Sequence, residues 1–285
     1  MKNIAWLLLP FFLLLTESAC TEPPEAVNPP GYNLAKPVVF NMPSVLEEIS
    51  GIAFNNGNTE TVYAEQDEEG KLFYFHLGDK EVTHTKFSKR GDYEDVAICN
   101  GWVIMLRSDG VFFTFPLKEI ANKDAGNVQE QDGLLPAGEY ESLYADEANQ
   151  QLYLLCKNCS ADKSSGSVSG HIFALSADGK LSKKSQFSVD EKAIAQLAGK
   201  DNIKLKASGM AMNPVTHQWY ILSSVNRLLL IADAQWKPVS VHALNPGLFT
   251  QPEGIAFDKA GNMYIANEKG NAELGTILLF KYQKK

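Results

Sequence analysis

The sequence lacks the features that mark several common protein classes. The apolar run near its start, residues 7–15 (LLLPFFLLL), has nine residues, whereas a membrane-spanning helix needs about 20. The chain has 26 basic and 34 acidic residues and no basic stripe, so nucleic acid is not an expected partner. Neither the G-x-S-x-G motif of serine hydrolases nor the H-E-x-x-H motif of zinc proteases occurs. The first hypothesis is therefore neither a nucleic-acid-binding protein nor a serine hydrolase or zinc protease of these two kinds.

Cysteine is also scarce, with four residues in 285. Cys99 lies in an apolar strand pattern and is expected to be a buried thiol. Cys156 and Cys159 form the sequence C-K-N-C, which leaves open a local disulfide or two free thiols. A zinc site would need a second ligand pair of the C-x-x-C or H-x-x-H kind, and the chain has none.

The N-terminus is typical of an exported protein. Lys2 and the apolar run fit a signal peptide, and Ser18-Ala19-Cys20 resembles the lipobox of bacterial lipoproteins. We therefore assign residues 1–19 to a signal peptide, residues 20–36 to a Pro-rich tether lipidated at Cys20, and residues 37–285 to the folded domain. This predicts a protein anchored to the cell envelope through lipid on Cys20, with the outer membrane the expected location. The alternative is cleavage near Ala19, which would leave a soluble periplasmic protein.

One short pattern recurs five times and determines the predicted fold. Its first residues are separated by 44, 47, 67 and 45 positions, and each copy is followed by two further strand-like runs. A repeat of about 45 residues with four strands has the size of one propeller blade. The copies are Ser50-Gly51-Ile52-Ala53-Phe54, Glu94-Asp95-Val96-Ala97-Ile98, Glu141-Ser142-Leu143-Tyr144-Ala145, Ser208-Gly209-Met210-Ala211-Met212 and Glu253-Gly254-Ile255-Ala256-Phe257.

The repeats predict an all-β fold, a five-bladed β-propeller with four-stranded blades. The fifth repeat ends after three strands, so residues 37–40 (PVVF) are expected to supply its fourth strand and close the ring. Two insertions explain the long step of 67 residues. Residues 158–170 are expected to form a Ser/Gly-rich loop, and residues 190–199 a short helix capped by Asp190.

Acidic residues are concentrated at the first position of the repeat. In a propeller the first strand of each blade is innermost, so Glu94, Glu141 and Glu253 are expected to converge on the central axis. Glu48 lies two residues before Ser50 and shares that face of the strand. Carboxylates so close together repel one another unless they are protonated or bridged by a cation. We therefore predict an axial Ca²⁺ site with Glu48, Glu94, Glu141 and Glu253 as ligands. Solvated side chains at the rim are the alternative.

A second ring is predicted where the second strands end. Its members should face the mouth of the channel and bind a ligand, and the two cations among them could neutralise the carboxylates without any metal. Together with the serines of the first ring, these channel-mouth residues are Ser50, Asp67, Arg107, Lys157, Ser208, Ser224, Asn267 and Glu268.

The chain resembles the SdiA-regulated family, distant relatives of NHL-repeat propellers. The resemblance is strongest at residues 206–211 (KASGMA), 220–224 (YILSS), 251–258 (QPEGIAFD) and 264–268 (YIANE). Residues 93–97 (YEDVA) are similar to the family's LEGIA segment, although Asp95 replaces its usual glycine, as Ser142 does in the next repeat. The resemblance implies a five-bladed propeller with calcium bound at such glutamates. It implies no reaction.

Two functions are compatible with these observations. The first is a non-enzymatic, monomeric module on the cell envelope that binds a small ligand or an envelope protein at the metal-organised mouth of the channel. The alternative is a calcium-dependent hydrolase of the lactonase or phosphoesterase type, with Glu268 or Asp67 as general base. The catalytic residues of such an enzyme cannot be assigned from the sequence.

Overall fold

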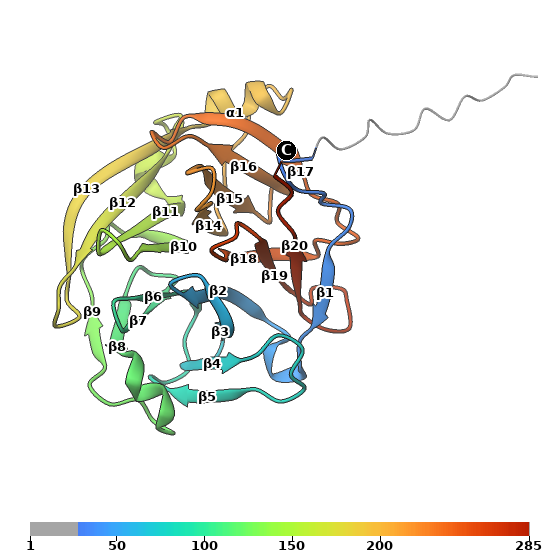
Figure 1. Ribbon diagram of the computed structural model, residues 1–285. Coiled ribbons are helices and arrows are strands. Elements are labelled where there is room, and N and C mark those ends of the chain that lie inside the picture. Colours follow the sequence, from blue (N-terminus) through green and yellow to red (C-terminus); the bar gives the residue numbers. More distant parts are fainter. Residues whose placement is uncertain (1–27, 285) are drawn as a thin grey trace, which may run out of the picture.

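The computed structural model describes residues 28–284 and shows five antiparallel sheets of four strands each, arranged around a central axis (Figure 1). The predicted five-bladed propeller is therefore confirmed. Blades one and two contain β2 (Ile49–Asn55), β3 (Asn58–Gln66), β4 (Lys71–Phe75), β5 (Thr83–Lys86), β6 (Tyr93–Cys99), β7 (Trp102–Arg107), β8 (Phe112–Pro116) and β9 (Gln129–Gln131).

The remaining three blades complete the ring. In blades one to four the first strand lies nearest the axis and the others follow outward in sequence order, whereas blade five runs outward from β18 through β19 and β20 to β1. These blades contain β10 (Gly138–Asp146), β11 (Gln151–Cys159), β12 (Ser167–Leu175), β13 (Leu181–Asp190), β14 (Gly209–Met212), β15 (Trp219–Ser223), β16 (Leu228–Ala232), β17 (Pro238–Ala243), β18 (Gln251–Phe257), β19 (Met263–Glu268), β20 (Thr276–Phe280) and β1 (Val38–Asn41).

The two ends of the chain close the ring in the predicted way. Strand β1 pairs antiparallel with β20, with Val38 opposite Leu279 and Asn41 opposite Thr276. Blade five therefore combines three C-terminal strands with one N-terminal strand. This pairing covers the edge of β20 that would otherwise stay open.

Apolar strands fill the space between adjacent blades. The inner and second strands are buried at their centres, and in β15 every residue from Trp219 to Ser223 is buried. Tight turns with positive φ join many neighbouring strands, for example at Asn56 and Gly57 between β2 and β3. Buried apolar side chains of neighbouring blades form four large clusters around the ring.

Few helical segments interrupt the strands of the described chain. The helix α1 (Glu191–Leu197) follows β13, and the Asp190 carboxylate accepts hydrogen bonds from the Lys192 and Ala193 amides, as the sequence predicted. Short 3₁₀ turns are η1 (Ser44–Leu46), η2 (Leu117–Ala121) and η3 (Ser160–Asp162). No helix among residues 28–284 is long and apolar enough to cross a membrane.

Two sequence expectations need correction. The loop expected over residues 158–170 is shorter, at residues 160–166, because β11 and β12 extend into the segment from both sides. Ser167 pairs with Asp190 at the end of the β12–β13 hairpin. The end of the predicted tether is also packed, because Tyr32 and Leu34 are buried among the apolar side chains of blades four and five. The Tyr32 hydroxyl donates to the Gly261 carbonyl at 2.5 Å. The signal peptide, Cys20 and the first part of the tether lie outside the described residues.

Candidate axial carboxylate site

The leading residues of the five repeats lie at one end of the inner strands, and four of them sit at β-bulges. The ladder between the first two strands of a blade is interrupted at Ser50, Glu94, Glu141 and Glu253. In blade four, Ser208 directly precedes β14. A bulge releases one residue from regular pairing and re-aims its side chain. This local irregularity turns the carboxylates toward the axis.

Two carboxyl groups of blade five form a hydrogen-bonded unit with blade one. The Ser50 hydroxyl oxygen lies 3.1 Å from both Glu253 Oε2 and Glu268 Oε1. The Gln251 side-chain amide donates to Glu253 Oε1 at 3.1 Å and also to Glu268. Burial and the adjacent Glu253 raise the pKa of Glu268 well above its ordinary value. Within this unit the Glu268 carboxyl group therefore favours its protonated form.

The carboxylates of blades two and three form a second group around one lysine. Lys157 pairs with Glu141 Oε1, whereas Glu141 Oε2 is buried without a partner. The partly exposed side chain of Glu94 has no hydrogen bond or ion pair to another side chain among residues 28–284. Burial raises the pKa of Glu141 to about 7 against the opposing effect of Lys157. Burial, followed by the charges of Glu141 and Asp92, raises the pKa of Glu94 to about 10.

The predicted second ring is only partly correct, because neighbouring residues at the ends of the second strands point in opposite directions. The second residue of each pair faces the axis: Lys157 contacts Glu141, and Glu268 contacts Ser50. Asp67 lies near Glu48 and Glu253, whose charges add to the effect of burial and raise its pKa to about 6. The Ser224 amide donates to the hydroxyl of Ser208 at 3.1 Å, which places both at the same end.

The first residues of these pairs turn toward the body of the blade, so the placement of Arg107 and Asn267 was wrong. The Arg107 guanidinium pairs with Asp109 and reaches Glu130 on the outermost strand of its blade. The Asn267 side chain donates to Thr276 on β20. Side chains alternate along a strand, so a shift of one residue reverses their direction. In blade two the axis-facing residue is Ser108, which donates to Asp92.

A further ring was missed although its signal is in the sequence. It lies two residues before each leading position, where Glu48 alone was noticed. The charges of Asp92 and Glu139 contribute to the raised pKa values of Glu94 and Glu141, respectively, so these side chains lie near the cluster. The period of two along a strand would have found them. The five positions are Glu48, Asp92, Glu139, Lys206 and Gln251.

The two departures from the family's motif are accommodated by side-chain hydrogen bonds. Where the motif has glycine, the next blade approaches closely: a Cβ at Gly209 would lie 2.1 Å from the Glu253 carbonyl oxygen. Asp95 instead bridges two blades, since its carboxylate accepts from the amides of Val96 at 2.8 Å and Leu143 at 2.6 Å. The Ser142 hydroxyl bonds both backbone groups of Leu155 across its own bulge.

The oxygen atoms of the axial carboxyl groups are ligands of the kind that a hard cation prefers, but they do not lie close enough together to coordinate one. Two buried oxygens, Asp67 Oδ1 and Glu141 Oε2, are acceptors that have no hydrogen-bond partner. Oxygen-only carboxylate ligands favour Ca²⁺. However, within residues 28–284 the only trio of acidic, histidine or cysteine ligand atoms within 4.8 Å of one another is that of Cys156, Cys159 and Asp162. The axial carboxylates would therefore have to turn inward around an ion.

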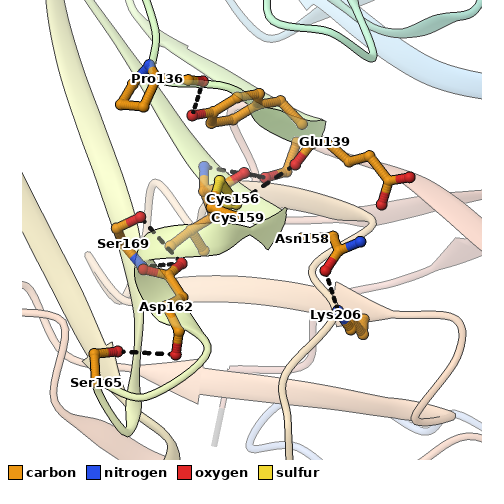
Figure 2. The surroundings of a disulfide bond; sticks show 12 residues. Pro136, Glu139, Cys156, Asn158, Cys159, Asp162, Ser165, Ser169 and Lys206 are labelled. Atoms are coloured by element: carbon orange, nitrogen blue, oxygen red, sulfur yellow. Dashed lines mark hydrogen bonds between the residues drawn. A yellow bond between two sulfur atoms is a disulfide. The ribbon is translucent and has the colours of Figure 1, made fainter.

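A disulfide holds the strand that carries Lys157. Cys156 and Cys159 are joined, with their Cα atoms 6.0 Å apart, and Gly138 gives the bridge room because a Cβ there would lie 2.4 Å from Cys159 Sγ. Figure 2 shows Asp162 and Ser169 on one side of the bridge and the Asn158–Lys206 hydrogen bond on the other. Cys99 is a buried free thiol, as expected.

Comparison with known proteins supports the fold and the family resemblance. The SdiA-regulated family model matches residues 171–271, which include the leading residues Ser208 and Glu253. The resemblance inferred from the sequence is thus confirmed over this part of the chain. No curated protein matches the sequence significantly.

Several solved structures share the architecture at low sequence identity. Glutaminyl cyclase of Myxococcus xanthus has a TM-score of 0.55 at 14% identity, with 87% of this chain and 96% of that chain covered. A luciferin-regenerating enzyme has a TM-score of 0.54 at 12% identity, with coverage of 86% and 95%. The calcium-binding protein regucalcin of Agrobacterium tumefaciens has a TM-score of 0.50 at 13% identity, with coverage of 90% and 96%. At these identities the likeness concerns the fold alone.

Proposed function

We propose that the protein is a non-enzymatic binding module of the cell envelope whose axial carboxylates hold a Ca²⁺ ion. The ion would organise the mouth of the channel, where a small ligand or an envelope protein binds. In this proposal the chain is exported, acts as a monomer and is anchored to the membrane through lipid on Cys20.

The observation that carries the proposal is the unmet acceptor capacity at the axis. Glu141 Oε2 and Asp67 Oδ1 are buried without a partner, and Glu94 has none among the described residues. A buried carboxylate without a partner is costly, and a cation removes that cost. Lys157 supplies one positive charge and satisfies only Glu141 Oε1. A divalent ion between Glu94, Glu141 and Glu253, with Glu48 and Asp67 at the rim, would supply the rest.

The chemistry of this end favours Ca²⁺ over other common ions. All the available ligands are oxygens, and no histidine or free cysteine of the described chain belongs to the cluster. Mg²⁺ requires a near-ideal octahedron, whereas Ca²⁺ accepts six to eight oxygens in irregular arrangements. Carboxylates that come from separate blades, together with water molecules, would form an irregular arrangement of oxygens, which suits Ca²⁺ better than Mg²⁺. Regucalcin, a calcium-binding protein that shares the fold, is consistent with this choice.

The N-terminal segment would orient the site in an anchored protein. Tyr32 packs beside Gly261 in the turn between β18 and β19, which is the end of blade five opposite Glu253. The chain therefore joins the propeller at the end away from the carboxylates. With lipid on Cys20, the mouth of the carboxylate site would face away from the membrane and toward soluble ligands.

Calorimetric titration with Ca²⁺ and then Mg²⁺ tests the proposal on protein purified without metal. We expect one saturable Ca²⁺ site, weaker Mg²⁺ binding, and a loss of at least tenfold in Ca²⁺ affinity for Glu94→Gln. Glu273→Gln is the matched control, because it removes one exposed carboxylate from a loop of the same blade as Glu253. The absence of heat with Ca²⁺, or equal losses for the two variants, would refute the axial calcium site.

A calcium-dependent hydrolase is the second candidate, and the pKa of Asp67 favours it. Burial and neighbouring carboxylates raise that pKa to about 6, which suits a general base acting near neutral pH. Assays against lactones, aryl esters and phosphomonoesters with added Ca²⁺ address this reaction class. Turnover that Glu253→Gln abolishes in folded protein would establish the enzyme and overturn the preference for a binding module.

A further inference from the structure

A large apolar cavity opens at the end of the axis opposite the carboxylates. Its volume is about 650 Å³, within the usual range for small-molecule sites. Each of the five inner strands contributes the residue four positions after its leading residue. These lining residues are Phe54, Ile98, Ala145, Met212 and Phe257.

A ring of buried apolar side chains lies between the leading residues and this end of the inner strands. The ring consists of the residues two positions after each leading residue, and all five are between 1% and 6% exposed. Their members are Ile52, Val96, Leu143, Met210 and Ile255. None of the residues that form the carboxylate site lines the cavity, so the two are distinct candidate sites.

The charges at the cavity's rim are mostly negative. Asp146, Glu147 and Asp258 line it together with one cation, Lys259, which gives 1 − 3 = −2 with His217 neutral. Asp146 and Asp258 already accept hydrogen bonds within their own turns, from Asn149 and Asn262. Glu147 differs, because its Oε2 is buried and has no partner. It is the carboxylate at this rim that is available to a ligand.

We propose that this cavity binds a small amphipathic amine, with an apolar ring system in the cavity and its ammonium group on Glu147. The apolar walls exclude a strongly polar ligand, and Met210 and Met212 provide adaptable surfaces for a flat ring. The negative rim disfavours carboxylic acids such as fatty acids. An ammonium group would pair with the Glu147 carboxylate by a charge-assisted hydrogen bond.

Three probes of one shape test the proposal on the full folded chain. They are 2-(1-naphthyl)ethylamine, 2-(1-naphthyl)ethanol and 1-naphthylacetic acid, titrated by calorimetry at pH 7. We expect saturable binding of the amine, at least tenfold tighter than that of the alcohol, with the acid weakest. Binding of the acid equal to or tighter than that of the amine would overturn the proposal, as would no saturable binding of any probe at millimolar concentration.

Variants then locate the site. Glu147→Gln should weaken amine binding at least tenfold and leave alcohol binding unchanged, whereas Ala145→Phe should fill the cavity and abolish both. If Ala145→Phe lowers the melting temperature, Met212→Phe fills the same space from blade four. Glu94→Gln should leave amine binding unchanged, which separates this proposal from the calcium site. Amine binding that survives Glu147→Gln and both cavity-filling variants would show that the probe binds elsewhere.

Discussion

The two ends of the propeller's axis are built by the same five strands but differ completely in chemistry. At one end the leading residues are glutamate or serine, with further carboxylates around them. Two residues later each inner strand carries a buried aliphatic side chain or methionine. Four residues later the strands line an apolar cavity. A change of polarity over two positions in every repeat creates two independent sites on one scaffold.

Backbone geometry explains why the polar end can exist. Four of its five leading residues lie at bulges, where the interrupted ladder leaves side chains free to point at the axis. Further along, the ladders between the first two strands are regular except for a shift between Phe54 and Asn55 in blade one, and the blades pack through apolar contacts. The polar end is thus held by close backbone contacts between blades, whereas the apolar end is held by side-chain packing. The following predictions test that division, from the largest effect to the smallest.

Gly254→Ala should cause the largest loss of stability at the polar end. A Cβ there would lie 2.3 Å from the Ser50 carbonyl oxygen of the next blade, so backbone must shift. We expect the free energy of unfolding to fall by about 3 kcal/mol. Gly247→Ala is the matched control, since its nearest atom, Asn245 Oδ1, is 3.4 Å away. Urea unfolding measures both, and equal losses would contradict close contact between blades.

Free Ca²⁺ at a hundred times its dissociation constant should stabilise the protein by about 2.7 kcal/mol. The cause is binding to the folded state alone, and thermal unfolding with and without EDTA measures it. Glu147→Gln, at the apolar end, should keep the whole response, whereas Glu94→Gln should lose most of it. A Glu147→Gln variant that no longer responds would show that the two ends are coupled.

Replacing both cysteines of the disulfide by serine should cost about 2 kcal/mol. A loop this short gains only modest chain entropy when the crosslink is removed. Because Lys157 lies between Cys156 and Cys159, the double variant should also alter Ca²⁺ affinity, while amine binding at the far end stays constant. Chemical unfolding with and without a reducing agent measures the stability. A wild-type protein that is insensitive to reduction would contradict a structural disulfide.

Glu65→Gln should flatten the dependence of stability on pH. Glu65 is fully buried and accepts a hydrogen bond from the Gly51 amide at 2.6 Å, and burial raises its pKa well above 4.5. Above pH 4.5 the unfolded chain loses this proton while the folded chain keeps it. The group's contribution to stability therefore falls as pH rises, by about 1.4 kcal/mol per unit.

Urea unfolding in EDTA between pH 5 and 8 should show a smaller negative slope for Glu65→Gln than for the wild type. Exposed Glu60 provides the control variant, Glu60→Gln, which should keep the wild-type slope. If the stability of Glu65→Gln changed with pH as steeply as that of the wild type and of Glu60→Gln, Glu65 would be ionised in the folded protein.

The fold was predictable because it is periodic, and the site was only partly so. Five copies of one pattern predicted the five blades. Because the fifth copy ends after three strands, residues 37–40 were predicted to supply the fourth and close the ring. The burial of Tyr32 could not be read from a Pro-rich segment, because it depends on a pocket formed by Tyr220, Phe257 and Tyr282. The repeat also placed the glutamates at one end of the axis.

The main error in the predicted site was the direction of side chains at the ends of the second strands, outside the five-residue pattern. Arg107 and Ser108 are adjacent, and only the exact strand register decides which faces the axis. Bulges change that register locally, and nothing in residues 93–95 (YED) identifies one. Hydrogen bonds between blades, such as that from the Leu143 amide to Asp95, depend on contacts that no sequence spacing reveals.

A crystal structure of the protein grown with Ca²⁺ tests the division between the two ends most directly. The account predicts one ion on the axis, with oxygens of Glu94, Glu141 and Glu253 about 2.3–2.6 Å away and no ion near the apolar cavity. An axis without an ion at saturating Ca²⁺, with Lys157 still paired to Glu141, would contradict it.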